Sequence, residues 1–159
     1  MTIKKIAIFD MDGVLVDSSW RYKVLPCGSK IDLDHWRKHE KAAFFDPLLP
    51  MAQEYKEMLN NPDYYVIIAT ARLCHSADLA FIDMKLGRPD MLICRSGEKD
   101  TRGGAQLKIE GLKRLFNLKQ FKQIDKANIV MFEDNAKYLK AICDFFHIRG
   151  VYIPSQQGH

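Results

Sequence analysis

The sequence has no long hydrophobic run. None of its apolar segments approaches the roughly 20 residues that a helix needs to cross a bilayer, which argues against a membrane protein. The first five residues lead directly into a short apolar stretch and lack the charged and apolar pattern of a secretory signal peptide. We therefore expect a cytoplasmic protein that does not contact a membrane.

Cysteine is sparse, and several signature patterns are absent. The chain has four cysteines, which are Cys27, Cys74, Cys94 and Cys143. They are widely spaced and form no CxxC pair, so a disulfide framework and a structural zinc site are both disfavoured. The sequence has no GxxxxGKS/T loop, which excludes a P-loop kinase, and it has no internal repeat.

The composition favours one globular domain that spans residues 1–159. A chain of 159 residues with 47% hydrophobic and 28% charged residues can bury a substantial core. Its net charge of +4 is uninformative, but residues 95–122 contain eight Lys or Arg and only three Asp or Glu. Such a surplus is typical of a surface that faces an anion or of an ordinary solvated helix face, and both interpretations stay open.

Short apolar runs alternate with amphipathic segments along most of the chain. The runs predict strands at Lys5–Phe9, 65–69, 91–94, 129–132 and 151–153. Apolar residues at helical spacing predict helices after Pro50, over 76–86, around 109–116 and after a capping residue at Asn135. Repeated strand–helix alternation predicts an α/β fold with a mostly parallel five-stranded sheet and helices on both faces.

Residues 18–47 interrupt this alternation. The segment is too short to form a domain with its own core, and we expect a short helix from about Leu33 with Asp32 or Asp34 as its N-cap. A small cap or rim beside a substrate site and plain structural packing are both open. We expect its aromatic residues to pack onto the body of the protein; these are Trp20, Trp36, Phe44 and Phe45.

Two carboxylates lie one residue apart where the first strand ends. Asp10 and Asp12 follow the apolar run of that strand, and Gly13 permits a turn that lets both face one cavity. Two acids this close favour a shared cation, and oxygen ligands suit magnesium. One carboxylate could then attack a phosphoryl group while the other handles the proton. A solvated turn is the alternative interpretation of the same residues.

Three further polar stretches follow later strands at the same predicted edge of the sheet. They contain Thr70, Ala71 and Arg72, then Arg95, Arg102 and Lys108, and finally Glu133 and Asp134. A hydroxyl, an arginine fork and a lysine can bind phosphate, and an acidic pair at a buried strand end is costly without a cation. A turn with a surface arginine and a helix cap are the simpler alternatives, although a cap explains only one residue of the acidic pair.

The ordered set of motifs resembles the haloacid dehalogenase superfamily of phosphatases over nearly the whole chain. Residues 9–17 resemble its first motif, Thr70 its second, Lys108 its third, and Glu133 with Asp134 its fourth. The resemblance implies a Rossmann-like three-layer fold. It also implies an enzyme that forms an aspartyl-phosphate intermediate.

The resemblance also assigns roles to individual residues. It makes Asp10 the nucleophile, Asp12 the general acid and base, and Lys108 a catalytic cation. It implies Mg²⁺ as cofactor, held by Asp10, by the main-chain carbonyl of Asp12 and by Asp134, with Glu133 in the outer shell. Thr70, Ala71, Arg72, Arg95 and Arg102 would hold the substrate.

A closer resemblance concerns Arg95, the run Asp100-Thr101-Arg102 and Lys108. This pattern is similar to the 3′-phosphatase domain of bacteriophage polynucleotide kinases, and it implies removal of a 3′-phosphate from DNA or RNA ends in nucleic-acid repair. The chain departs from that pattern at Ala71, Lys99, Glu133 and Asn135. A phosphatase of free nucleotides or other small phosphate esters is therefore an alternative, as is an inactive nucleic-acid-binding protein with the same fold. The sequence indicates no oligomeric state.

Overall fold

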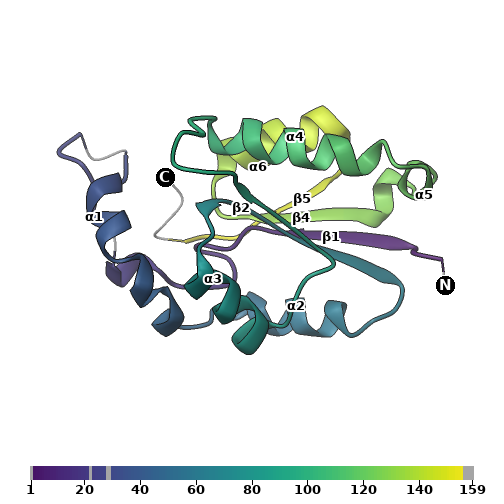
Figure 1. The fold of residues 1–159 in the computed structure, drawn as a ribbon. Helices are drawn as coiled ribbons and strands as arrows, with labels where there is room; N and C mark the ends of the chain where they lie inside the picture. The colour runs from purple at the N-terminus through teal and green to yellow at the C-terminus, as the bar shows by residue number, and fades with distance from the viewer. Residues whose placement is uncertain (1, 22, 28–29, 156–159) are drawn as a thin grey trace.

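The computed structural model describes residues 2–21, 23–27 and 30–155, which are built around one five-stranded parallel sheet (Figure 1). The strands are β1 Lys5–Phe9, β2 Tyr64–Leu73, β3 Met91–Arg95, β4 Ile129–Glu133 and β5 Arg149–Tyr152. They lie in the order β3-β2-β1-β4-β5, so β1 is central. The chain proceeds outward from β1 in one direction through β2 and in the other through β4. The carboxyl ends of β1 and β4 therefore form the switch point where such sheets bind ligands.

Helices cover both faces of this sheet, and the predicted three-layer α/β fold is confirmed. One face carries α4 Gly104–Phe116, α5 Lys119–Lys122 and α6 Ala136–Phe146, and the other carries α2 Met51–Leu59 and α3 Ser76–Phe81 (Figure 1). A short 3₁₀ turn, η4 Lys126–Asn128, leads into β4. Among the residues that the structure describes, no helix is both long and apolar enough to cross a membrane.

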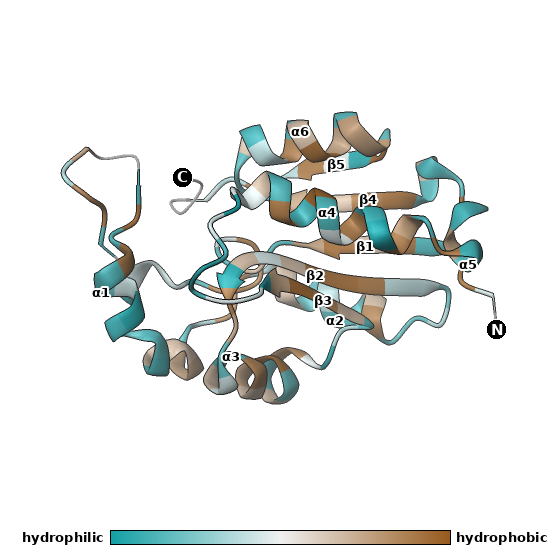
Figure 2. Ribbon diagram, turned by 45° about the horizontal axis from the view of Figure 1, so that its top comes forward, coloured by the Kyte–Doolittle hydropathy of each residue, from teal (hydrophilic) through white to brown (hydrophobic). Residues whose placement is uncertain are grey.

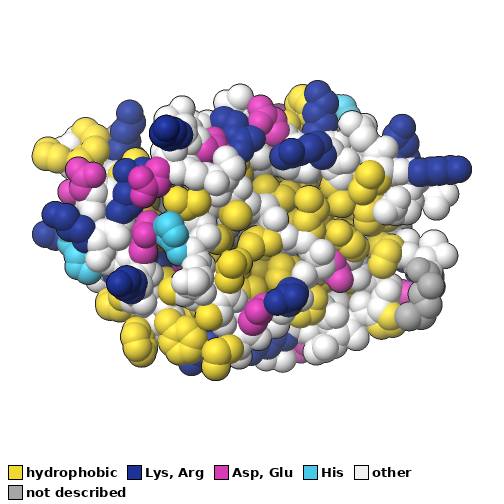
Figure 3. Space-filling view, viewed as in Figure 1, with side chains coloured by type: hydrophobic (Ala, Val, Ile, Leu, Met, Phe, Trp, Pro, Cys, Tyr) yellow, Lys and Arg dark blue, Asp and Glu magenta, His cyan; other side chains and the backbone are white. Residues whose placement is uncertain are grey.

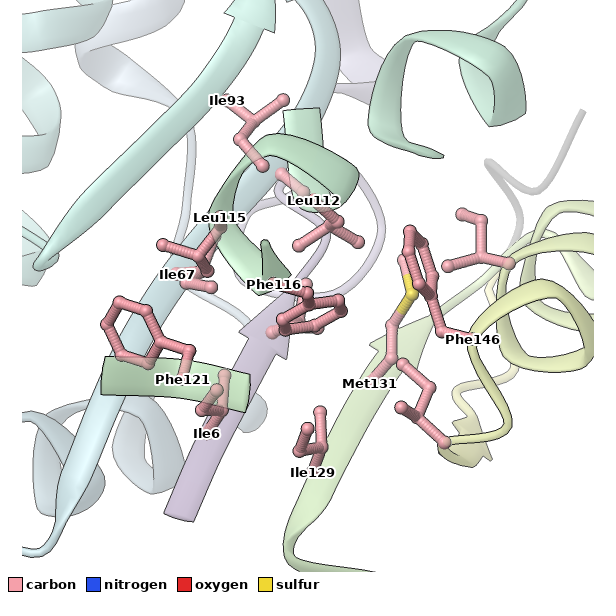
Figure 4. Packing of buried hydrophobic residues seen from close by; sticks show 14 of the residues in the cluster. Ile6, Ile67, Ile93, Leu112, Leu115, Phe116, Phe121, Ile129, Met131 and Phe146 are labelled. Atoms are coloured by element: carbon pink, nitrogen blue, oxygen red, sulfur yellow. The ribbon is translucent and has the colours of Figure 1, made fainter. Parts of the chain in front are cut away.

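The core is divided by the sheet into two clusters. On the α4 and α6 side, Ile6 and Ile8 of β1 pack with helix residues such as Leu112 and Phe116 (Figure 4). On the other side, Phe9 stacks on Phe132, with ring centroids 4.8 Å apart. Because β1 is buried on both faces from Ile6 to Phe9, these residues form a continuous apolar run. Figure 2 shows largely hydrophobic central strands between helices that carry both hydrophobic and hydrophilic residues.

The boundaries of two predicted strands differ from the structure by more than one residue. Strand β2 does not end at residue 69 but continues to Leu73, because it pairs with β3 beyond the end of β1, across a register irregularity between Ala69 and Leu73. Strand β5 begins at Arg149, two residues before the predicted 151. This strand is an exposed edge, so its first residues need not be apolar.

The predicted helices are present. The helix expected over 76–86 is split into α3 and a π-helical turn, η3 Ile82–Leu86, in which the amide of Gly87 donates to the carbonyl of Ile82 at 2.7 Å. Gly87 ends it with φ = 95°, a conformation that favours glycine. Asn135 caps α6 as predicted, since its side chain accepts a hydrogen bond from the amide of Tyr138 at 3.1 Å.

The 18–47 segment lies between β1 and α2, beyond the carboxyl ends of the strands (Figure 1). Its helices are η1 Ser19–Arg21, α1 Leu33–Lys38 and η2 Glu40–Phe45. Asp32 is the N-cap of α1 and accepts from the amide of His35 at 3.1 Å, which confirms one of the two predicted caps.

The prediction that all four aromatic residues of this segment pack inward is wrong for two of them. Trp36 and Phe44 are half-buried, but Trp20 is 54% exposed and Phe45 is 75% exposed. The indole of Trp20 donates to the buried Asp46 at 3.0 Å, so its polar edge is held by the body while much of its ring is exposed. Phe45 contacts Phe44 edge-to-face at 5.9 Å and lies on the outside of this pair.

Candidate active site

Asp10 follows β1 directly at the switch point of the sheet. Its amide donates to the carbonyl of Phe132 at 3.0 Å, which keeps the turn after β1 against β4. Lys108 reaches it from the second turn of α4, and its ammonium donates to Asp10 Oδ1 at 2.9 Å and to Glu133 Oε2 at 2.6 Å. The Lys108 side chain is only 2% exposed. The structure therefore brings together three residues that the sequence places 98 and 25 positions apart.

Asp10, Glu133 and Asp134 form a buried acidic cluster. Each offers one carboxylate oxygen, and these oxygens lie within 4.8 Å of one another. Burial raises the pKa of Asp10 to about 8, and burial together with the charge of Asp10 raises the pKa of Asp134 to about 7. Lys108 is a cation in direct contact with the cluster, and its own pKa is raised by Asp10 and Glu133 against the lowering effect of burial. The acidic side chains of the cluster therefore outnumber this lysine.

The cluster fits a hard divalent cation. Oδ2 of Asp134 is buried and has no hydrogen-bond partner among the residues that the structure describes. An unsatisfied carboxylate oxygen beside two other carboxylates is a suitable donor set for Mg²⁺, which prefers oxygen ligands. The carboxylate of Asp12 is not part of this cluster.

Local backbone structure sets this geometry. Gly13 has φ = 80°, and a Cβ at this position would overlap the carboxylate of Asp134. Oε1 of Glu133 accepts hydrogen bonds from the amides of Asp134 and Asn135 at 3.1 and 3.2 Å. The helix-cap alternative therefore accounts for Asn135, while the acidic pair that precedes it faces Asp10 and Lys108.

Asp12 faces different partners from Asp10. Its carboxylate accepts from Ser18 Oγ at 2.6 Å, from Arg72 Nε at 3.3 Å and from Arg72 Nη2. Burial alone would raise the pKa of Asp12, but Arg72 outweighs it and holds this pKa below its usual value. Arg72 also donates to Asp78 at 2.6 Å. Because Arg72 is buried, its guanidinium lies on the interior side of the Asp12 carboxylate, away from solvent.

The other predicted substrate-binding residues are near the site but have internal partners. Thr70 is buried, and its Oγ1 accepts from the amide of Arg72 at 3.1 Å. Arg95 donates to the carbonyls of Ala71, Asp100 and Arg102 at 2.9, 2.7 and 2.8 Å. Arg102 pairs with Asp100 at 2.7 Å and with Glu110. These contacts fix the loop after β3.

A cleft of about 840 Å³ opens between the 18–47 segment and this loop. Asp12 and Arg72 line it, together with Trp36 of α1 and Arg95 and Arg102 of the loop. Figure 3 shows charged side chains of both signs at the end of the molecule that carries α1. The cleft therefore gives a solute access to Asp12.

Four residues near Arg72 escape the sequence analysis: Ser18, Arg21, Asp46 and Asp78. Asp78 is three residues into a helical segment, which is typical of a capping acid, and its side chain does accept from the amide of His75 at 2.9 Å. Arg21 and Asp46 lie in an irregular segment, where no periodicity joins them. Only the folded chain shows that they meet.

The overall fold is similar to those of known hydrolases. A haloacid dehalogenase-like family protein from Streptococcus pneumoniae aligns with a TM-score of 0.64 and 14% identity, over 96% of this chain and 87% of the other. A putative phosphatase from Clostridium difficile aligns with a TM-score of 0.64 and 19% identity, over 99% and 90%. A chain of the Pnkp1/Rnl/Hen1 complex aligns with a TM-score of 0.64 and 19% identity, over 98% of this chain but 47% of the other. At these identities the likeness establishes the fold.

Sequence comparison gives a more specific result. No curated protein matches the sequence significantly. Residues 1–128 match the sequence profile of the bacteriophage T5 5′-deoxynucleotidase family, and this range includes the turn after β1, the 18–47 segment and Lys108. The fold is that of the haloacid dehalogenase-like proteins. Because the matched region is most of the chain, the chain belongs to the bacteriophage T5 5′-deoxynucleotidase family.

Proposed function

We propose that this protein is a magnesium-dependent phosphomonoesterase that hydrolyses deoxynucleoside 5′-monophosphates. The observation that carries the proposal is the buried Asp10 carboxylate at the switch point, bound by Lys108 beside Glu133 and Asp134. The family match to 5′-deoxynucleotidases supports the choice of substrate.

Asp10 acts as the nucleophile in this proposal. Lys108 binds Oδ1, so we assign the attack to Oδ2. The bond from Asp10 to phosphorus forms as the bond from phosphorus to O5′ breaks, and the product of this step is an aspartyl-phosphate. Water then hydrolyses the intermediate. Lys108 and Thr70 stabilise negative charge on the phosphoryl oxygens.

The acidic cluster would hold the magnesium ion. Asp10, Asp134 and the main-chain carbonyl of Asp12 are the proposed ligands, with Glu133 in the outer shell. Bound magnesium would neutralise charge on the carboxylates and on the phosphoryl oxygens. This assignment accounts for the unpaired oxygen of Asp134 and for the raised pKa values of two neighbouring acids.

Asp12 handles the proton. It donates a proton to the leaving O5′ and then accepts one from the attacking water. Arg72 lowers the pKa of Asp12 in the free protein. A phosphate dianion in the cleft adds negative charge nearby, so we expect the bound substrate to raise this pKa and favour the protonated acid.

The cleft supports a small substrate. Its volume of about 840 Å³ lies within the range of about 300–1,000 Å³ that is typical of small-molecule sites. Arg95 and Arg102 were expected to hold the substrate, but their contacts with Asp100, Glu110 and backbone carbonyls already use much of their donor capacity. A mononucleotide requires fewer cationic contacts than a polynucleotide end.

Removal of 3′-phosphates from polynucleotide ends is the second candidate. It is favoured by the resemblance of residues 95–108 to phage 3′-phosphatase domains and by the fold shared with a chain of the Pnkp1/Rnl/Hen1 RNA repair complex. Exposed Lys113 and Arg114 on α4 and Lys119 and Lys122 on α5 supply positive charge that a polyanion could use. Such binding would weaken steeply as the salt concentration rises.

A substrate panel tests the proposal. We expect kcat/KM for deoxynucleoside 5′-monophosphates to exceed that for a 3′-phosphorylated oligonucleotide by at least about tenfold, with activity lost on chelation of magnesium. The reverse preference, together with steep salt dependence, would favour the second candidate. Absence of turnover on every substrate, including a generic aryl phosphate, would reject both and favour an inactive binding protein.

A further inference from the structure

A buried ion pair joins the two ends of the 18–47 segment. Arg21 Nε donates to Asp46 Oδ1 at 2.8 Å, and Arg21 Nη2 donates to Asp46 Oδ2 at 2.9 Å. Each side chain is 1% exposed. A buried ion pair gains little net stability, because desolvation of both charges offsets much of their attraction. Stability alone therefore does not explain this pair, and the proposed function gives neither residue a role.

Further contacts of Asp46 link this ion pair to the active site. Asp46 Oδ2 lies 3.6 Å from Arg72 Nη2, and Arg72 in turn binds Asp12. Both guanidinium groups lie over the indole ring of Trp36. The Cζ atoms of Arg21 and Arg72 are 4.2 and 5.3 Å from the ring centroid. The series Arg21, Asp46, Arg72 and Asp12 thus runs from the base of the 18–47 segment to a carboxylate that lines the cleft.

Burial changes sharply along this series. The side chains of Arg21, Asp46 and Arg72 are 1–2% exposed, whereas that of Asp12 is 27% exposed. A partly exposed carboxylate has freedom to rotate unless a fixed partner holds it. Arg72 is such a partner only while Asp46 and Asp78 hold its guanidinium, since its fork contacts both acids as well as Asp12.

We propose that Arg21 and Asp46 are positioning residues for the phosphatase reaction. They fix the guanidinium of Arg72. Arg72 and Ser18 then hold the Asp12 side chain in the orientation from which it can protonate the leaving oxygen. This proposal rests on the proposed function and extends it, because it gives the 18–47 segment a role in the proton transfer as well as in lining the cleft.

The proposal makes the effect depend on the leaving group. When the bond from phosphorus to O5′ breaks, the electron pair goes to O5′, and Asp12 supplies the proton that this alkoxide requires. A nitrophenolate leaves without a proton. An incorrectly oriented Asp12 therefore slows cleavage of the nucleotide but not cleavage of the aryl phosphate. A general structural defect slows both.

The test is the substitution Asp46→Asn, with kcat/KM as the readout because it reports only the steps through formation of the aspartyl-phosphate. We expect a loss of about tenfold to a hundredfold for a deoxynucleoside 5′-monophosphate and less than about threefold for 4-nitrophenyl phosphate. Equal losses on both substrates, or no loss on either, would overturn the proposal.

Asp83→Asn is the matched control. It removes the same chemical group from another two-pronged pair, in which Arg88 donates to Asp83 at 3.2 and 3.0 Å on the exposed surface. This variant should keep wild-type values on both substrates. If Asp46→Asn does not fold, Arg21→Lys must show the same selective loss, since it keeps the positive charge but removes the two-pronged contact with Asp46.

A bridging-sulfur substrate separates proton transfer from nucleoside binding. The 5′-S-phosphorothiolate of the same deoxynucleoside keeps the base and sugar but leaves as a thiolate. We expect it to restore Asp46→Asn to within about threefold of the wild type on that substrate. Failure of this rescue would show that the variant binds the nucleoside poorly and would reject the positioning role. Absence of any wild-type turnover would instead reject the proposed function itself.

Discussion

Asp10 and Asp12 are separated by one residue, yet different parts of the protein hold them. Asp10 belongs to a core half of the site, with Lys108 from α4 and Glu133 from β4. Asp12 belongs to an insertion half, with Arg72 from β2 and Ser18 from the 18–47 segment.

The two halves have opposite electrostatics. Burial raises the pKa of Asp10 to about 8, while Arg72 overcomes burial and lowers the pKa of Asp12. These directions hold for the protein without metal or substrate. In the proposed reaction magnesium lowers the pKa of Asp10 and the bound phosphate raises that of Asp12, so the two groups can take different roles. We assign attack on phosphorus to the core half and proton transfer to the insertion half, and the following predictions test this division.

The largest expected effect is in the core half. Asp10→Asn keeps the size of the side chain but removes the nucleophile, so kcat should fall by at least about 10⁴-fold on nucleotides and aryl phosphates alike. Steady-state kinetics of the folded variant, checked by circular dichroism, measures this loss. Retention of substantial activity on either substrate would move the nucleophile away from Asp10.

Lys108→Met should have the next largest effect, and it should again be independent of the leaving group. It removes the cation between Asp10 and Glu133, so we expect kcat/KM to fall by about 10²- to 10³-fold on both substrates. Leaving two buried carboxylates without their partner should lower the free energy of unfolding by about 3–5 kcal/mol, measured by urea denaturation.

Lys140→Met is the control for loss of a lysine. Lys140 pairs with Asp144 at 2.7 Å on the exposed face of α6, far from this chemistry, and its loss should change neither activity nor stability appreciably. A loss for Lys108→Met that was confined to nucleotides would contradict the division, because it would give the core lysine a part in proton transfer.

The core half was more predictable from sequence than the insertion half. Asp10, Lys108, Glu133 and Asp134 are tied to strands that end at one sheet edge or to a helix that begins there, so their proximity follows from the topology. Arg21 and Asp46 have no such frame, since their meeting depends on the path of an irregular segment. Arg72 was expected at the site, but its direction toward Asp12 depends on Asp46 and Asp78, which only the packed structure places.

The fold shows the same contrast. Buried strands such as β1 and β4 are continuous apolar runs, and their positions are predicted closely. The extension of β2 to Leu73 was missed because its last residues include Thr70 and Arg72, which are polar and buried by tertiary contacts. The start of β5 was missed because Arg149 and Gly150, the first residues of this exposed edge strand, are not apolar.

A pH series without metal examines the acidic cluster. Asp10 and Asp134 have folded-state pKa values of about 8 and about 7, above their ordinary value of 3.8, so the folded state binds protons more tightly than the unfolded state. Stability should therefore fall as the pH rises through this range, by about 3–4 kcal/mol between pH 6 and pH 8.

Magnesium should flatten this pH dependence, because the cation replaces the protons that the folded state otherwise retains. Asp134→Asn should reduce the slope measured without metal. Thermal denaturation across the pH series, with and without magnesium, measures both effects. A rise in stability from pH 6 to pH 8 in the absence of metal would contradict the assigned pKa shifts.

The smallest effect is expected at Arg102. Its guanidinium already pairs with Asp100 and Glu110, so Arg102→Met should change kcat/KM for deoxynucleoside 5′-monophosphates by less than about threefold. The same variant measured on a 3′-phosphorylated oligonucleotide sharpens the choice of substrate. A selective loss of tenfold or more on the oligonucleotide would favour the polynucleotide activity.

The division between the halves is tested most directly by trapping the intermediate in Asp12→Asn. This variant keeps Asp10 but lacks the base that activates water. After mixing with 4-nitrophenyl phosphate and magnesium, we predict a burst of one nitrophenolate per protein molecule and an acid-quenched adduct of one phosphoryl group on the peptide that contains Asp10. Sustained wild-type turnover, or a phosphoryl group on any other residue, would contradict the account.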